Sequence, residues 1–148
     1  MNKYLKSAYT EAKKAYKMDE VPVGAVIVKD GKVIARAYNK KESTKDPLGH
    51  AEILAIKKAC KKLNTWHLDD CEMYVTLEPC TMCVGAIVHS RIKTIYYGAL
   101  DSRFGAIEGS YKLLEIGKFN HYPKTIYLED KECSKILSEY FRLKRNKS

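Results

Sequence analysis

The stretch from Val75 to Cys83 constrains the fold of this chain more than any other. Its sequence, VTLEPCTMC, joins a short β-type run to a proline and then to two cysteines spaced three residues apart. If a helix starts at Pro79, both cysteines lie in its first turn on one face, because residues i and i+3 are neighbours on a helix. The unpaired N–H groups and positive dipole end of a helix start favour thiolate over thiol. The stretch therefore predicts a strand, a turn and a helix whose start suits a soft metal ion.

Segments typical of strands and helices alternate along the rest of the chain. The periodicity predicts helices over residues 3–18, 50–63, 80–89 and 111–116, and a C-terminal helix around 133–141. It predicts strands over residues 24–28, 33–38, 71–77, 92–98 and 125–128, with polar loops over 39–49 and 99–110. Asp30 and Gly31, between the first two strands, predict a hairpin, which makes the sheet mixed rather than wholly parallel. We therefore expect a single α/β layered domain over residues 1–148.

Two of the expected helices have a defined apolar face. In the helix 50–63 this face consists of Ile53, Ile56, Cys60 and Leu63, with lysines on the opposite, solvated side. In the C-terminal helix it consists of Cys133, Ile136, Leu137, Tyr140 and Phe141. Because Cys60, Cys71 and Cys133 fall at apolar-facing positions, we expect them to pack in the core rather than to form disulfides.

The net charge of the chain is +9, from 27 lysines and arginines against 18 acidic residues. Excess positive charge attracts polyanions, so nucleic acid is the first partner to consider, although a lysine excess also serves solubility. No apolar run reaches the ~18 residues that a membrane helix needs, and charges interrupt the N-terminal residues where a signal peptide would be apolar. We therefore expect a cytoplasmic protein with no membrane partner.

A histidine and a carboxylate open the expected second helix. His50 and Glu52 lie two residues apart, and His50 precedes Cys80 by thirty residues. This order, H-x-E followed by P-C-x-x-C, is the signature of zinc-dependent nucleobase deaminases. His50, Cys80 and Cys83 supply three zinc donors, which leaves a position for a water whose pKa the metal lowers to about 7. Glu52 is then placed to take a proton from that water and return it to the substrate ring and the leaving nitrogen.

Other interpretations use the same residues. The two cysteines alone suit a redox pair of the thioredoxin type. A structural zinc would need a fourth donor, for which Cys71, His67 and His89 are the candidates. His50 alone suits a capping histidine, and Glu52 alone suits an ordinary acid in a first helical turn. Their combination in this order, with each half opening a helix, favours a catalytic zinc site.

Beyond these motifs, the chain resembles the bacterial tRNA-specific adenosine deaminases, which convert the wobble adenosine of an arginine tRNA to inosine. The similarity runs over nearly the whole length. It rests on residues 20–26, Asn39, 50–53, 74–80, 87–92, 98–99 with Asp101, 120–121 and 140–142. One departure is that the segment 105–110 is one residue longer than the commoner family pattern. The resemblance implies the cytidine deaminase-like fold, a three-layer α/β/α sandwich with a mixed sheet of about five strands.

The resemblance also implies roles for individual residues. One zinc ion per subunit would be held by His50, Cys80 and Cys83, with Glu52 as the proton shuttle. Asn39 would hydrogen-bond the edge of the flipped base, and Asp101 would contact the sugar of the neighbouring nucleotide. The anticodon loop would be held by Tyr140, Phe141, Arg142 and Arg145. Without the resemblance, Asn39 suits a turn that closes a strand, Asp101 suits a loop acid, and at least one of the two aromatic residues suits core packing.

The family is homodimeric, with the partner subunit bordering the active site, so we expect a homodimer here. The leading hypothesis is a zinc-dependent deaminase of the wobble adenosine in a tRNA anticodon loop. An enzymatic alternative keeps the same metal chemistry but acts on free cytosine, guanine or adenosine. A non-enzymatic alternative is a zinc-stabilised RNA-binding protein, against which Glu52 argues, because a structural zinc has no use for an unligated carboxylate beside it.

Overall fold

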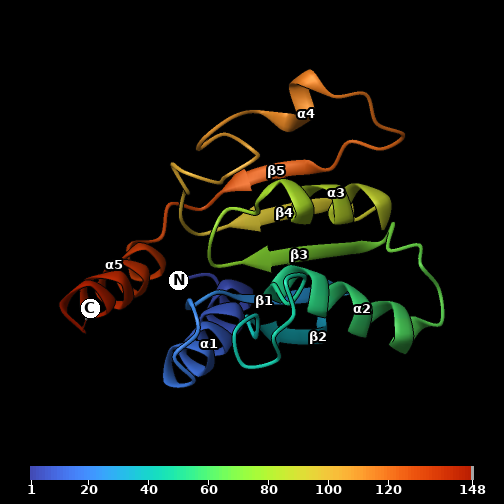
Figure 1. Cartoon of the computed structure of the whole chain (residues 1–148). Helices are drawn as coiled ribbons and strands as arrows, with labels where there is room; N and C mark the ends of the chain where they lie inside the picture. Colours follow the sequence, from blue (N-terminus) through green and yellow to red (C-terminus); the bar gives the residue numbers. More distant parts are fainter. Residues whose placement is uncertain (148) are drawn as a thin grey trace.

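A computed structural model describes residues 1–147 and contains the predicted elements in the predicted order (Figure 1). The helices are α1 (Lys3–Lys17), α2 (Ala51–Leu63), α3 (Thr81–His89), α4 (Leu113–Ile116) and α5 (Lys131–Lys147). The strands are β1 (Gly24–Lys29), β2 (Lys32–Tyr38), β3 (Cys71–Val75), β4 (Thr94–Tyr97) and β5 (Lys124–Tyr127).

The five strands form one sheet in the order β2-β1-β3-β4-β5. β1 runs antiparallel to both β2 and β3, whereas β3, β4 and β5 are parallel to one another, which confirms the mixed sheet. The hairpin between β1 and β2 turns at Asp30 and Gly31, whose φ angles of 51° and 74° are both positive. Positive φ angles at both central residues are typical of a type I′ turn, whose twist matches that of the two strands it joins. The predicted hairpin is therefore also confirmed.

Helices cover both faces of the sheet and complete a three-layer α/β/α sandwich. α1 approaches β1 so closely that a Cβ on Gly24 would lie 2.0 Å from the carbonyl oxygen of Ala8. On the same face, a Cβ on Gly98, just after β4, would lie 2.6 Å from the sulfur of Cys133 in α5. α2 packs on β1 and β2 and contacts α3 on the opposite face, where the two helices lie together in Figure 1.

The predicted helix faces are confirmed in part. The fully buried residues of α2 are Ala51, Glu52, Ala55 and Ala59. Of the predicted face, Ile56, Cys60 and Leu63 pack against the core but are only half-buried, and Ile53 is half-buried as well. Small side chains let the helix backbone approach the strands closely, and the larger side chains then flank the contact. In α5, Tyr140 is 8% exposed as predicted, but Phe141 is 45% exposed. Cys71 and Cys133 are buried, as predicted, and Cys60 is half-buried.

The strand directions bring chemically important segments to one edge of the sheet. β2 and β3 are both antiparallel to β1, so they end at the same edge as β4 and β5. Asn39 follows β2, residues 76–80 follow β3, and Asp101 lies in the loop after β4. α2 and α3 begin at this edge, which therefore holds every residue of the predicted metal motif.

Candidate active site

The metal motif lies at two helix starts, as predicted, but the second helix begins later than expected. His50 is the N-cap residue of α2 and Cys80 is the N-cap residue of α3, both in extended backbone conformations. The helix therefore starts at Thr81 rather than at Pro79, and only Cys83 lies within its first turn. The side chain of His50 makes no hydrogen bond to its own helix start and instead lies beside the sulfur of Cys80.

The three predicted ligands meet in space. The distance from His50 Nδ1 is 3.6 Å to the sulfur of Cys80 and 3.5 Å to the sulfur of Cys83. All three donor atoms lie within 4.8 Å of one another. A single soft ion fits among one imidazole nitrogen and two sulfurs at this separation, because zinc–nitrogen and zinc–sulfur bonds are roughly 2.0–2.3 Å long.

The proposed fourth donors of a structural zinc do not join this group. Within residues 1–147, Cys71, His67 and His89 all lie outside the cluster. Cys71 opens β3 at the opposite edge of the sheet, and His89 is the last residue of α3. His67 stacks on Trp66 and faces Asp69 instead. The described residues therefore bring together three candidate metal donors, and three protein ligands are typical of a catalytic rather than a structural zinc site.

The electrostatics of the cluster favour a thiolate. Hydrogen bonds from the Cys83 thiol and from His50 lower the pKa of Cys80 to about 4, against the opposing effect of burial. The hydrogen bond between Cys83 and Cys80, together with burial, raises the pKa of Cys83. The bond to Cys80 and the charge of Glu52 raise the pKa of His50, while burial lowers it. A negatively charged sulfur beside an imidazole is the donor set that zinc prefers.

Glu52 lies in the first turn of α2 and is only 4% exposed. Burial raises the pKa of its carboxyl group to about 7, and the charge of Cys80 adds to this effect while His50 opposes it. Such a group can accept and release a proton at neutral pH. The structure therefore places a buried carboxyl group beside the three donor atoms, and its role as a proton shuttle stays a prediction.

Asn39 and Asp101 lie at the same edge, and their side chains shape its loops. The side-chain amide of Asn39 donates to the carbonyl of Val21 at 3.2 Å, and its oxygen accepts from the N–H of Lys41 at 3.1 Å. Oδ1 of Asp101 accepts from the N–H groups of Arg103 and Phe104 at 3.0 and 3.1 Å. Both residues thus have the turn-forming roles that suit their sequence context. Asn39 is 8% exposed.

The four predicted residues of α5 divide into one packed residue and three exposed ones. Tyr140 packs edge-to-face on Tyr16 at 6.1 Å and donates to the carbonyl of Asp19 at 3.2 Å. Phe141, Arg142 and Arg145 are exposed. Tyr140 therefore attaches α5 to α1, while the other three side chains face outward.

Sequence reasoning missed two buried carboxylates that organise the loops of this edge. Glu20 is 1% exposed and accepts the N–H groups of Glu42 and Ser43 at 3.0 and 2.6 Å. Glu78 is 2% exposed and accepts four N–H groups from the loop after β4. The available signal was an acidic residue within a few residues of a strand, followed by Val-Pro in one case and by Pro-Cys in the other. That signal does not reveal the partners.

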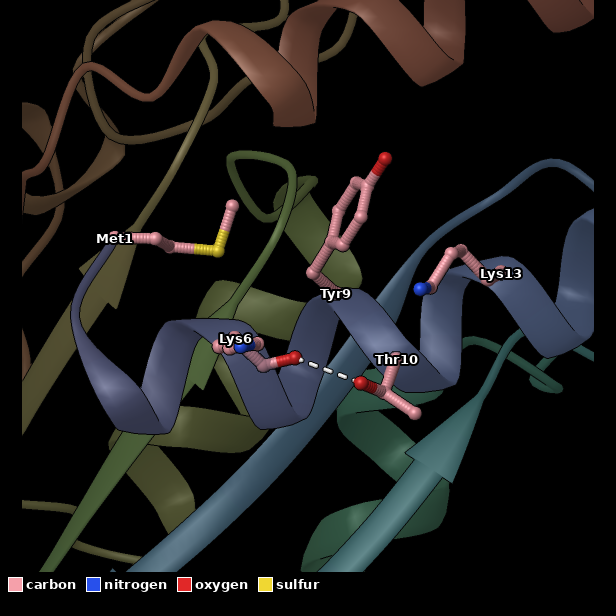
Figure 2. Close-up of a pocket in the computed structure, with 5 residues that line it drawn as sticks. All are labelled: Met1, Lys6, Tyr9, Thr10 and Lys13. Carbon is pink, nitrogen blue, oxygen red and sulfur yellow. Dashed lines mark hydrogen bonds between the residues drawn. The ribbon is translucent and has the colours of Figure 1, made fainter.

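A hollow of about 250 Å³ lies elsewhere on the molecule, over α1. Figure 2 shows its lining, with Met1 and Tyr9 standing away from the helix and the Thr10 hydroxyl donating to the carbonyl of Lys6 at 3.0 Å. α1 covers the face of the sheet opposite to α2 and α3. The hollow is therefore separate from the cluster of His50, Cys80 and Cys83.

Comparisons with known proteins agree with this geometry. The family of MafB19-like deaminases matches residues 1–145. The tRNA-specific adenosine deaminase of Aquifex aeolicus is 49% identical over 143 residues, which cover 97% of this chain and 95% of that protein. A structure from a study of A-to-I editing by tRNA:A34 deaminases has a TM-score of 0.89 at 41% identity, covering 93% of this chain and 100% of that one.

A guanine deaminase is also similar. The structure of the Bacillus subtilis enzyme has a TM-score of 0.65 at 37% identity and covers 99% of this chain and 95% of its own. The Aquifex protein is more similar in sequence, and the tRNA:A34 deaminase structure is more similar in fold. Together with the metal motif, these similarities show that the chain belongs to the family of tRNA-specific adenosine deaminases.

Proposed function

We propose that this protein hydrolyses the wobble adenosine of a tRNA anticodon loop to inosine and releases ammonia. By resemblance, the substrate is an arginine tRNA. The observation that carries the proposal is the buried carboxyl group of Glu52 beside the donor cluster of His50, Cys80 and Cys83. The cluster occurs in a chain 49% identical to a tRNA-specific adenosine deaminase.

The proposed cofactor is one zinc ion per subunit, held by His50, Cys80 and Cys83. The three donor atoms lie within 4.8 Å of one another, and the low pKa of Cys80 supplies a thiolate without an outside base. A zinc ion with three protein ligands lowers the pKa of a coordinated water to about 7.

Glu52 is the proposed proton shuttle of the reaction. A carboxyl oxygen of Glu52 takes a proton from the water that attacks C6 of adenine and delivers it to the ring nitrogen N1. Glu52 then takes the proton of the hydroxyl group added at C6 and delivers it to the amino group, which leaves as ammonia while the C6 carbonyl forms. A pKa of about 7 lets one group perform both transfers. Its burial keeps bulk water away from the protons in transit.

The target base has to leave its stack before it can reach Glu52, and a flexible anticodon loop makes this possible. We assign the edge of the flipped base to Asn39 and the neighbouring sugar to Asp101. Each keeps unassigned polar capacity after its local hydrogen bonds, one amide N–H in Asn39 and Oδ2 in Asp101. On α5, Phe141 would contact the RNA, while Arg142 and Arg145 would contact phosphates, with Tyr140 fixing the helix.

We further propose a cytoplasmic homodimer whose partner subunit borders the site. Within the described residues no helix is long and apolar enough to cross a bilayer. Ile53 of α2 and Met82 of α3 are half-buried, so part of each apolar side chain remains available for contact with a second subunit. Sedimentation equilibrium would test the dimer, for which a mass of two chains is expected and a mass of one chain would contradict it.

The competing activity is deamination of a free base, which the similarity to a guanine deaminase favours. Assays of tRNA, free adenosine, free cytosine and free guanine with the zinc-loaded protein separate the two. We expect inosine in tRNA and no turnover of the free compounds. Turnover confined to a free base would overturn the proposal. Tight RNA binding without any turnover would instead support a non-catalytic RNA-binding protein.

A further inference from the structure

The carboxylate of Glu78 lies in a nest of backbone N–H groups from the loop that follows β4. Its Oε1 accepts from Asp101 at 3.0 Å, and its Oε2 accepts from Ile107, Glu108 and Gly109 at 2.9, 2.7 and 2.8 Å. Glu78 is 2% exposed, so these groups replace water around a buried charge. One side chain thus fixes both ends of the segment 101–109.

Two glycines let the loop approach this carboxylate. A Cβ built on Gly105 or on Gly109 would lie 2.4 Å from Oε1 of Glu78. Real Cβ atoms do not come this close to an oxygen, so the loop requires glycine at both positions for lack of space. The glycines of the sequence GAIEG are therefore explained by the nest around Glu78.

The loop is also bonded to the segment that carries Cys80. The N–H of Ala106 donates to the carbonyl of Pro79 at 2.9 Å, and the N–H of Glu78 donates to the carbonyl of Ala99 at 2.8 Å. Glu78 itself precedes Cys80 by two residues. The position of the loop is consequently tied to the start of α3 and to the donor cluster.

Glu108, within the longer segment 105–110, is held as well. The hydroxyl of Tyr97, a β4 residue that is 1% exposed, donates to the carboxylate of Glu108. Burial and this hydrogen bond raise the pKa of Tyr97, which keeps the hydroxyl protonated at neutral pH. Glu108 is thus bonded through its backbone to Glu78 and through its side chain to the sheet.

The tip of this rigid loop exposes an aromatic ring and a guanidinium group. Phe104 is 59% exposed, and the guanidinium of Arg103 lies 5.1 Å from the centroid of its ring. Asp101 fixes the tip, because its Oδ1 accepts the N–H groups of both residues. Phe104 lies two residues before Ala106, which places its backbone within roughly 8 Å of the segment that carries Cys80.

We propose that Arg103 and Phe104 form a stacking platform for a base next to the flipped adenosine, and that Glu78 is the positioning residue that holds this platform. Aromatic rings and guanidinium planes are the side chains on which unpaired bases stack. A base that stacks here needs a platform of fixed position relative to the donor cluster, which the nest around Glu78 supplies. The identity of the ligand as an anticodon loop rests on the proposed function.

Binding of a fluorescent RNA tests the platform. The probe is an anticodon stem-loop with 2-aminopurine in place of the base on either side of the target, because stacking quenches its fluorescence. With the zinc-loaded wild type we expect quenching at one of the two positions. Phe104→Ala is expected to abolish the quenching and to raise KM for the RNA about tenfold with little change in kcat. Phe104→Trp should restore both, and Phe104→Leu should restore neither.

Trp66→Ala is the matched control, because Trp66 is an aromatic residue of similar exposure, 58%, at the opposite edge of the sheet. Glu78→Gln retains the size of the side chain but replaces one accepting oxygen with a donor. We expect it to lose the quenching and to raise KM while the zinc content per subunit stays unchanged.

The outcomes separate this inference from the proposed function. If the wild type deaminates tRNA but Phe104→Ala quenches and turns over as the wild type does, the platform is wrong and the enzyme assignment stands. If Glu78→Gln loses zinc together with quenching, Glu78 supports the fold as a whole rather than positioning the platform. If the wild type neither binds nor deaminates the RNA, the proposed function itself fails.

Discussion

Glu52 is the side chain on which the proposed reaction depends most directly. We expect Glu52→Gln to retain zinc and RNA binding but to lower the rate of inosine formation by at least about 100-fold, since an amide cannot carry the proton. Inosine formation under single-turnover conditions measures this. Glu132→Gln, the same change in the first turn of α5 at an exposed position, is the control. An undiminished rate in Glu52→Gln would refute the shuttle.

Cys80 is the second residue whose proposed role, that of a thiolate ligand, can be tested separately. We expect Cys80→Ser to reduce bound zinc from about one ion per subunit to a small fraction after dialysis against a chelator, because a hydroxyl replaces the charged sulfur donor. Elemental analysis of the purified variants measures the zinc. Cys60→Ser should retain it, because Cys60 lies outside the donor cluster. Equal zinc in both variants would contradict the proposed ligand set.

The loop between β2 and α2 is the element that Glu20 stabilises. Burial and the neighbouring Asp19 raise the pKa of Glu20, but the N–H groups of Ser43 and Glu42 more than offset them and lower it below its ordinary value of 4.5. A lowered pKa in the folded state contributes stability that is complete above pH 4.5 and is lost as the pH falls through the folded-state pKa.

We therefore expect Glu20→Gln to reduce the free energy of unfolding by about 1.5–3 kcal/mol at pH 7. The difference from the wild type should shrink below pH 4.5, where Glu20 of the unfolded chain takes up a proton, and should be lost once the pH falls below the lowered pKa of the folded state. Urea denaturation at a series of pH values gives both quantities. A difference that stays constant down to acid pH would assign the loss to packing rather than to the charge of Glu20.

Element types and their order were predictable from periodicity, whereas the packed faces were less so. The spacing of Ile53, Ile56 and Cys60 predicts the inner face of α2, and Ile56 and Cys60 do pack against the core, but the fully buried apolar residues of that helix are its alanines. Hydrophobicity alone predicts that the larger residues are the most deeply buried. The close approach of the helix to the strands instead leaves room only for small side chains at the contact. Pro79 likewise suits a first helical position, but the helix starts two residues later.

At the scale of the whole molecule, the donor cluster was predictable and the loop anchors were not. His50, Cys80 and Cys83 are recognisable because zinc chemistry restricts both residue type and spacing. Glu78 is different, because its partners are backbone N–H groups 23 to 31 residues along the chain. Backbone groups have no sequence signature, so only the folded chain reveals which of them converge.

The effect of the net charge of +9 on tRNA binding depends on which charged side chains lie close to the bound RNA. We expect the double variant Arg142→Gln/Arg145→Gln to weaken tRNA binding. It should also make the slope of log affinity against log salt shallower by about 1.4, at roughly 0.7 per lost phosphate contact. Lys57→Gln/Lys61→Gln removes the same charge from the exposed side of α2 and should leave the slope unchanged. Filter binding over a salt series measures both, and equal slopes would assign the charge of α5 to solubility.

The central claim is that this chain makes inosine at the wobble position of a tRNA. Its most direct test is sequencing for inosine in total tRNA after incubation with the zinc-loaded wild type and, separately, with Glu52→Gln. We expect adenosine to be replaced by inosine at the wobble position with the wild type and to persist with the variant. Unmodified tRNA after incubation with a wild type that turns over a free base would contradict the account.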